Sequence, residues 1–288
     1  MTAHGYDLAV EVRGLRKRYG DVTAVDGIDL GIRRGEVFGL LGPNGAGKST
    51  TVEILQGNRD RDAGEVSVLG SDPATGTRAW RSRVGIVWQD ESAPAELTVR
   101  ETVRHFAGYY PRPRNPEEVI GLVGLEAKAD SRVKALSGGQ RRRLDVALGV
   151  IGGPDLLLLD EPTTGFDPAA RRQFWSLIRA LADEGTTILL TTHYLEEAEA
   201  LAHRLAVVAK GRIVAEGEPQ ALRERFGTEA VVEWTGPDGT PRVARTGTPT
   251  RVIAELMRRF DGEIPGLAVS RPTLEDVYLR LTGQEEAG

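Results

Sequence analysis

The sequence contains no cysteine among its 288 residues. This absence excludes a disulfide-stapled scaffold, thiolate metal ligands and a cysteine nucleophile, and it fits a reducing cytoplasmic compartment. Histidine is scarce as well, and the four histidines show no spacing typical of a metal site. A net charge of −5, from 37 basic and 42 acidic side chains, provides no overall basic field for nucleic acid. No nucleic-acid partner is therefore expected.

Long apolar runs are also missing. The best candidate, residues 146–159, is interrupted by Gly-Gly-Pro-Asp at 152–155 and falls short of the ~18 residues that span a bilayer. The first residues lack the basic and apolar regions of a signal peptide. With 40% hydrophobic and 27% charged residues, the composition is that of an ordinary folded protein. Any membrane role is expected to be peripheral.

Short apolar runs of strand length recur along the chain and alternate with helical patterns at 49–56 and 169–183. This alternation predicts βαβ units and an α/β fold. Residues 94–136 have a helical pattern of their own, with a proline-rich break at 111–116. The strands are expected at 8–15, 37–41, 84–88, 156–159 and 186–192, followed by a hairpin of 205–208 with 212–215.

The character of the sequence changes beyond about residue 226. A strand-like segment at 231–234, a turn at 236–239 and a helical pattern near 249–259 predict a small C-terminal α+β appendage. Thr273 and Asp276 then have the spacing of a capping box. We expect two domains, 1–222 and 223–288, with a helical subdomain at about 92–150 in the first.

A glycine-rich motif follows the expected strand at 37–41 and precedes an expected helix. It matches the pattern G-x-x-x-x-G-K-[ST], whose backbone amides surround phosphate oxygens. Lys48 would reach the β- and γ-phosphates, and the Ser49 hydroxyl would ligate Mg²⁺. The chain has only five lysines, which makes a chance match rare. The alternative is a merely flexible loop of Gly42, Pro43, Asn44, Gly45, Ala46 and Gly47.

Two carboxylates end the expected strand at 156–159. Asp160 would hold Mg²⁺ through water, and Glu161 would orient or deprotonate an attacking water. Taken alone, this pair is equally typical of a solvated turn. A third motif, Leu-Ser-Gly-Gly-Gln at 136–140, lies 20 residues before Asp160. Its Ser137 hydroxyl and the amides of the two glycines open a helix and suit a second anion.

These three motifs in this order resemble the ATP-binding-cassette ATPases. The resemblance implies a P-loop NTPase core with a mixed sheet, an N-terminal antiparallel β part, a RecA-like core and a helical subdomain. It implies ATP and Mg²⁺ as cofactors. It further implies a head-to-tail dimer, in which each ATP lies between one P-loop and the partner's Leu-Ser-Gly-Gly-Gln signature.

The resemblance assigns roles to further residues. Tyr19 matches the aromatic that stacks on adenine, although a packed surface tyrosine is the alternative. Gln89 and His193 match residues that contact Mg²⁺ or the γ-phosphate, and Asp167 lies in a dimer-crossing loop where Phe166 replaces the usual leucine. The implied catalytic residues are Lys48, Gln89, Glu161 and His193, and the implied metal ligands are Ser49, Gln89 and Asp160. The implied nucleotide-binding residues are Tyr19, Gly42, Asn44, Gly45, Ala46, Gly47, Lys48, Ser49, Thr50, Gln89, Ser137, Gly138, Gly139, Gln140, Asp160, Asp167 and His193.

The family includes transporter subunits and soluble proteins that act on ribosomes or DNA. One cassette without a coiled-coil insertion favours an energy-coupling subunit at the cytoplasmic face of a bacterial membrane, working as a homodimer on a separate multi-span permease. Residues 272–283 resemble the tail of the daunorubicin-resistance branch of drug, lipid or polysaccharide exporters, although Gln140 stands where that branch often has methionine. A soluble regulatory or nucleic-acid-associated ATPase remains the alternative. The transported substrate is not determined by these residues.

Overall fold

The computed structural model describes residues 7–87, 96–226, 229–260, 263–271 and 273–283. The chain forms two compact units, Met1–Val214 and Ala215–Gly288. Each unit has its own sheet and its own apolar core. The boundary near residue 222 and the subdomain limits at 92–150 stay predictions.

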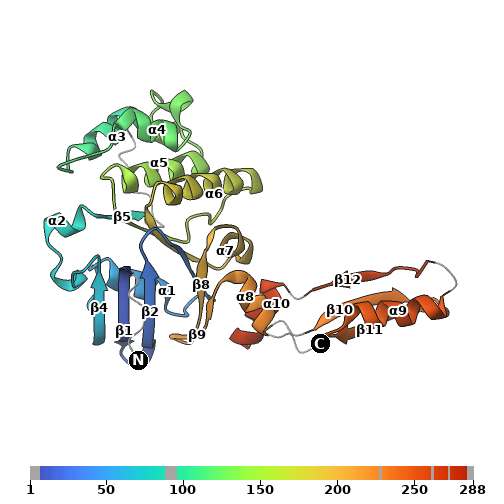
Figure 1. Ribbon diagram of the computed structural model, residues 1–288. Coiled ribbons are helices and arrows are strands. Elements are labelled where there is room, and N and C mark those ends of the chain that lie inside the picture. The colour runs from blue at the N-terminus through green and yellow to red at the C-terminus, as the bar shows by residue number, and fades with distance from the viewer. Residues whose placement is uncertain (1–6, 88–95, 227–228, 261–262, 272, 284–288) are drawn as a thin grey trace. The chain divides into compact units, whose positions relative to one another are not determined.

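A six-stranded sheet is the centre of the first unit (Figure 1). Its order is β5-β6-β7-β3-β8-β9, and the paired strands from β5 to β8 are parallel. Parallel strands buried on both faces have continuous apolar runs, which explains why these segments were predictable. The bounds are β3 Val37–Leu41, β5 Val84–Val87, β6 Leu156–Asp160, β7 Thr187–Thr192, β8 Arg204–Ala209 and β9 Arg212–Gly217.

An antiparallel sheet of order β2-β1-β4 forms the second layer of this unit. Its strands are β1 Leu8–Tyr19, β2 Val22–Arg33 and β4 Ala63–Val68. The strand expected at 8–15 is therefore too short, and β2 and β4 were not predicted. Several register shifts interrupt the pairing of β1 with β2, and such bulges disrupt the alternation of apolar and polar residues. The inner side chains of this sheet join one apolar cluster with Phe38, Leu40 and α1 Lys48–Leu55.

Several helices pack against the six-stranded sheet, and three further helices form the predicted helical insertion. The helix expected at 169–183 is α6 Pro168–Asp183, and short α7 Leu195–Leu201 follows β7. The insertion contains α3 Val99–Ala107, α4 Pro116–Leu122 and α5 Gly138–Val150, and α3 and α4 pack against α5 (Figure 1). Thr98 and Glu101 form the predicted capping box of α3. The remaining helical pieces are α2 Arg78–Arg81 and three 3₁₀ turns, Pro73–Thr75, Glu126–Lys128 and Val133–Ala135.

The second unit is a small α+β structure. A three-stranded antiparallel sheet of order β11-β10-β12 packs one amphipathic helix, and its core is Val232, Leu256 and Ile264. The predicted strand, turn and helix near 231–259 are confirmed, as is the capping box of Thr273 with Asp276; α8, β11 and β12 were not predicted. Its elements are α8 Pro219–Phe226, β10 Ala230–Thr235, β11 Pro241–Thr246, α9 Pro249–Arg259, β12 Ala268–Ser270 and α10 Leu274–Thr282.

No helix within the described residues combines the length and the apolar composition needed to cross a bilayer.

Candidate functional site

The loop between β3 and α1 can be built only with glycine at two of its positions. Gly47 has a φ of 102°, and a Cβ atom there would lie 2.2 Å from the carbonyl oxygen of Ala24. A Cβ atom on Gly42 would lie 2.4 Å from the carbonyl oxygen of Val208. Asn44 and Gly45 are exposed at the tip of the loop. The motif therefore forms a tight turn pressed against neighbouring main chain, which leaves its outer side open for a ligand.

Lys48 is the first residue of α1, and its side chain is only 4% exposed. Its Nζ donates to the carbonyl oxygens of Gly42 at 2.7 Å and Pro43 at 3.2 Å, and it lies 3.7 Å from Oε1 of Glu161. Burial lowers the pKa of Lys48, and the nearby carboxylates of Glu161 and Asp160 offset part of that effect. The loop thus encloses a buried ammonium group whose present partners are mostly its own carbonyls.

The carboxylates predicted at the end of β6 lie beside Lys48 and α1. Asp160 Oδ1 accepts hydrogen bonds from Ser49 Oγ at 3.4 Å and from the Thr191 hydroxyl. Glu161 Oε2 lies 3.2 Å from His193 Nδ1, while its Oε1 faces Lys48. These residues meet because β3, β6 and β7 are parallel neighbours, so their carboxyl ends share one edge of the sheet.

The oxygen groups at this edge suit Mg²⁺. A hydroxyl from Ser49 and a carboxylate from Asp160 are hard donors already within hydrogen-bonding distance of each other. Within the described ranges, no three His, Asp or Glu side chains group closely enough to hold a metal on their own. The site therefore fits a Mg²⁺ ion that keeps water and substrate phosphate oxygens as its other ligands.

Tyr19, the predicted adenine contact, takes no part in these interactions. Tyr19 ends β1 with 40% of its surface exposed, and the Arg59 guanidinium lies 5.2 Å from the centre of its ring. An adenine base would stack on this exposed ring together with Arg59 or in its place. Gln89 lies outside the described residues. Ala46 is buried in the loop, and Thr50 is partly buried on α1.

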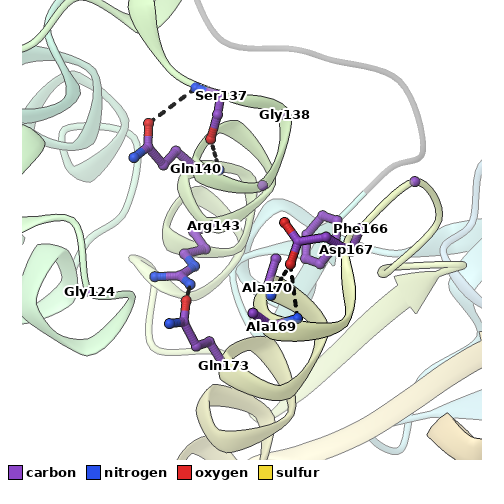
Figure 2. A pocket seen from close by; sticks show the side chains of 12 residues that line it. Gly124, Ser137, Gly138, Gln140, Arg143, Phe166, Asp167, Ala169, Ala170 and Gln173 are labelled. Atoms are coloured by element: carbon purple, nitrogen blue, oxygen red, sulfur yellow. Dashed lines mark hydrogen bonds between the residues drawn. The ribbon is translucent and has the colours of Figure 1, made fainter.

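The signature residues line a separate cavity of about 460 Å³ between the starts of α5 and α6 (Figure 2). Ser137 caps α5 and exchanges hydrogen bonds with Gln140, so the predicted helix start is confirmed. Asp167 caps α6 by accepting the amides of Ala169 and Ala170 at 2.9 and 2.8 Å. Arg143 bonds to Gln173 across the two helices. Among the described residues that line this cavity, none belongs to the glycine-rich loop at 42–47.

Comparison with known proteins decides the family. The family model described as ABC transporter matches residues 25–164. A Burkholderia pseudomallei protein named Nod factor export ATP-binding protein I is 41% identical over 296 residues, covering 96% of this chain and 97% of its own length. This chain belongs to the ABC transporter family. Within that family it is an ATP-binding subunit, and a protein of the same name from Ralstonia nicotianae is 43% identical over 304 residues, covering 96% and 94% of the two chains.

Solved structures confirm the predicted fold class of this ABC subunit. An ATP-binding subunit of an ABC transporter superposes with a TM-score of 0.68 at 28% identity, covering 76% of this chain and 93% of that one. A Clostridium perfringens protein described as part of the cbiONQ transporter complex has a TM-score of 0.68 at 29% identity, covering 75% and 90%. The expectation of a P-loop ABC-ATPase core was therefore correct.

Sequence reasoning missed several side chains that support the site. Thr191 pairs in register with Asp160, donates to its carboxylate and accepts the backbone amide of Glu161. Arg142 donates to the carbonyl oxygens of Asp160 and Pro162. Glu197, on α7, is fully buried. Arg142 stands in a run of three arginines and Glu197 follows another glutamate, so the sequence does not show which of these side chains is buried or what it contacts.

Glu197 is a buried acid behind the site. Its carboxyl group lies among the side chains of Thr192, Thr163 and Trp175. Burial raises its pKa above the ordinary value of 4.5, and the nearby polar groups of Thr192 and Thr163 offset only part of this effect. The carboxyl group is therefore more readily protonated in the folded chain than in the unfolded chain.

We expect Glu197→Gln to gain stability over the wild type as pH rises. Above 4.5 the unfolded chain releases the Glu197 proton while the folded chain retains it, so the wild-type free energy of unfolding falls through this window. Glutamine does not titrate, and the other groups cancel in the comparison. Urea unfolding at pH 5 and pH 8 measures the difference.

The neighbouring variant Glu196→Gln is the matched control, because the Glu196 side chain is 81% exposed on the same helix. Its stability difference from the wild type should stay constant across this pH range. An equally constant difference for Glu197→Gln would contradict the raised pKa.

Proposed function

We propose that this ABC subunit hydrolyses ATP to ADP and phosphate to drive a bacterial exporter. The observation that carries the proposal is the position of Glu161, whose two carboxylate oxygens lie 3.7 Å from Lys48 Nζ and 3.2 Å from His193 Nδ1. A carboxylate between a phosphate-binding cation and a histidine at the end of a P-loop sheet is suited to water activation.

The chemistry follows from the residues at the sheet edge. Amides of the glycine-rich loop and the Lys48 ammonium bind the β- and γ-phosphates, and Lys48 exchanges its carbonyl partners for phosphate oxygens. Ser49 and Asp160 would hold Mg²⁺, which supplies charge neutralisation when bound. Glu161 orients water and accepts its proton, and His193 fixes the Glu161 carboxylate and contacts the γ-phosphate. Gln89 is assigned the same roles as in the family, toward Mg²⁺ and the γ-phosphate.

We propose further that the working unit is a head-to-tail homodimer. Within one chain, the cavity at Ser137, Gly138, Gly139 and Asp167 is separate from the glycine-rich loop. A second copy supplies its signature to the first copy's nucleotide, with Gln140 maintaining the helix start that presents these amides. Tyr19 stacks on the adenine. A lone subunit therefore hydrolyses ATP slowly, and dimer closure completes both sites.

The transport role is supported by the names of the relatives. Proteins called Nod factor export ATP-binding protein I align with nearly the whole chain. We infer export of a drug, lipid or polysaccharide type of substrate through a separate multi-span permease at the cytoplasmic face of the cell membrane. The helical subdomain at about 92–150 provides the docking surface for that permease, and the C-terminal domain at 223–288 is accessory.

Purification of the tagged chain from gently solubilised membranes tests this assignment. We expect a multi-span membrane protein to co-purify, and we expect added ATP to be hydrolysed by the complex. Recovery with ribosomal or DNA-bound partners instead would favour the soluble ATPase class. A variant with Lys48→Ala should retain the membrane partner, which separates docking from nucleotide chemistry.

A further inference from the structure

Arg142 is a buried arginine on the signature helix α5, with 9% of its surface exposed. Its Nε donates to the carbonyl oxygen of Pro162 at 3.1 Å, and one terminal nitrogen donates to the carbonyl oxygen of Asp160 at 3.1 Å. Burial lowers its pKa, while the carboxylates of Asp145 and Asp160 offset part of that effect. An arginine remains charged in such an environment and serves only as a donor.

The two carbonyl groups that Arg142 binds flank Glu161. Glu161 has a φ of 43°, in the left-handed region that side chains other than glycine rarely adopt. Such a conformation persists only where the surrounding structure enforces it. The Glu161 amide donates to Thr191 Oγ1 at 3.0 Å, so β7 anchors one side of this residue and α5 anchors the carbonyls before and after it.

We propose that Arg142 is a positioning residue that holds Glu161 in its water-activating orientation and connects it to the signature helix. This inference rests on the proposed ATPase function. Arg142 lies one helical turn after Gly138, the first residue of α5. Gly138, Arg142 and Glu161 also line a common cavity of about 400 Å³. Ordering of the α5 start by a partner's nucleotide is thereby transmitted to Glu161 through one side chain.

Arginine is required here because of its shape. The planar guanidinium group presents two fixed nitrogens, Nε and one terminal nitrogen, to two carbonyl groups that lie two residues apart in sequence. A lysine ammonium keeps the charge but is a single point donor on a flexible chain. The substitution Arg142→Lys keeps the positive charge but removes the pair of hydrogen bonds to the carbonyls of Asp160 and Pro162. It therefore separates the effect of these two hydrogen bonds on catalysis from the effect of the charge.

Steady-state ATP hydrolysis and calorimetric ATP binding by the full chain test the proposal. We expect Arg142→Lys to lower kcat by about 30- to 100-fold, since small displacements of a catalytic group have effects of this order. Its Kd for ATP should stay within about threefold of wild type, because the glycine-rich loop is untouched. Arg142→Gln, which keeps donors but loses the charge and reach, should show the same split between kcat and Kd.

Arg83→Lys is the matched control. Arg83 is paired with Asp155 and is 45% exposed, and both residues precede strands, at the sheet edge opposite Glu161. Its kcat should equal that of the wild type. The double variant Glu161→Gln with Arg142→Lys should still form a closed dimer with ATP. The two hydrogen bonds of Arg142 are proposed to act on catalysis and not on nucleotide binding.

The outcomes separate the two proposals. An active wild type with equally active Arg142→Lys overturns the positioning role alone. Parallel losses of kcat and ATP affinity, or failure of both Arg142 variants to fold, assign Arg142 a structural role and also overturn it. A wild type that binds ATP but never hydrolyses it, alone or with its membrane partner, overturns the proposed function and this inference together.

Discussion

Substituting Lys48 with alanine is expected to raise the Kd for ATP by about 100-fold or more, because removing one partner of a buried charge pair costs roughly 2–5 kcal/mol. The Lys48 ammonium is nearly inaccessible and is held between the loop carbonyls and Glu161. Truncation removes the cation that faces the phosphates and leaves Glu161 Oε1 without the ammonium group 3.7 Å away. Isothermal calorimetry with ATP and Mg²⁺ measures the change.

Lys128→Ala is the control for this experiment. Lys128 is exposed on a 3₁₀ turn of the helical insertion, so its removal should leave ATP affinity unchanged. Thermal unfolding of both variants verifies that they fold. An unchanged Kd for Lys48→Ala would remove the basis for a phosphate-binding role of this lysine.

Replacement of Glu161 by glutamine is expected to preserve ATP binding and lower kcat by about 10²- to 10⁴-fold. An amide of the same size keeps the contacts around Glu161 but cannot accept a proton from water. It also removes a negative charge close to the position of the γ-phosphate. The variant should therefore accumulate as a closed dimer with ATP, which gel filtration with and without nucleotide detects.

Glu184→Gln provides the matched control for the catalytic variant. Glu184 follows α6 and pairs with Arg114, with its side chain 46% exposed. Its turnover and its response to ATP in gel filtration should match the wild type. Hydrolysis by Glu161→Gln at the wild-type rate would show that another group activates the water.

Local sequence patterns were sufficient for the elements that carry the motifs. The apolar runs at 37–41 and 156–159 became β3 and β6, and the capping signals at Thr98 and Ser137 begin α3 and α5 as predicted. Each of these signals depends on residues within one turn or one strand. By contrast, β2 and β4 were missed because bulged antiparallel pairing is decided by distant partners and not by a local period.

The order of the motifs predicted the nucleotide site, whereas the parallel sheet decides which of its side chains meet. Ser49 and Asp160 are 111 residues apart in sequence and meet because parallel β3, β7 and β6 bring their carboxyl ends together. Gln89 lies beyond the described residues, so its contact with Mg²⁺ stays a prediction. The assignments of the other motif residues are likewise hypotheses for mutagenesis.

The sequence by itself determined the family and the order of its motifs, because glycine turns, helix caps and apolar strands are encoded by neighbouring residues. Tertiary structure alone decided which polar side chains support them. Arg142 donates to the carbonyl groups on either side of Glu161, and the Thr191 hydroxyl accepts the backbone amide of Glu161. Glu197 is an acid that packing buries completely. Nothing local distinguishes these residues from other polar side chains, since their roles arise only when packing removes them from water and gives each a specific partner.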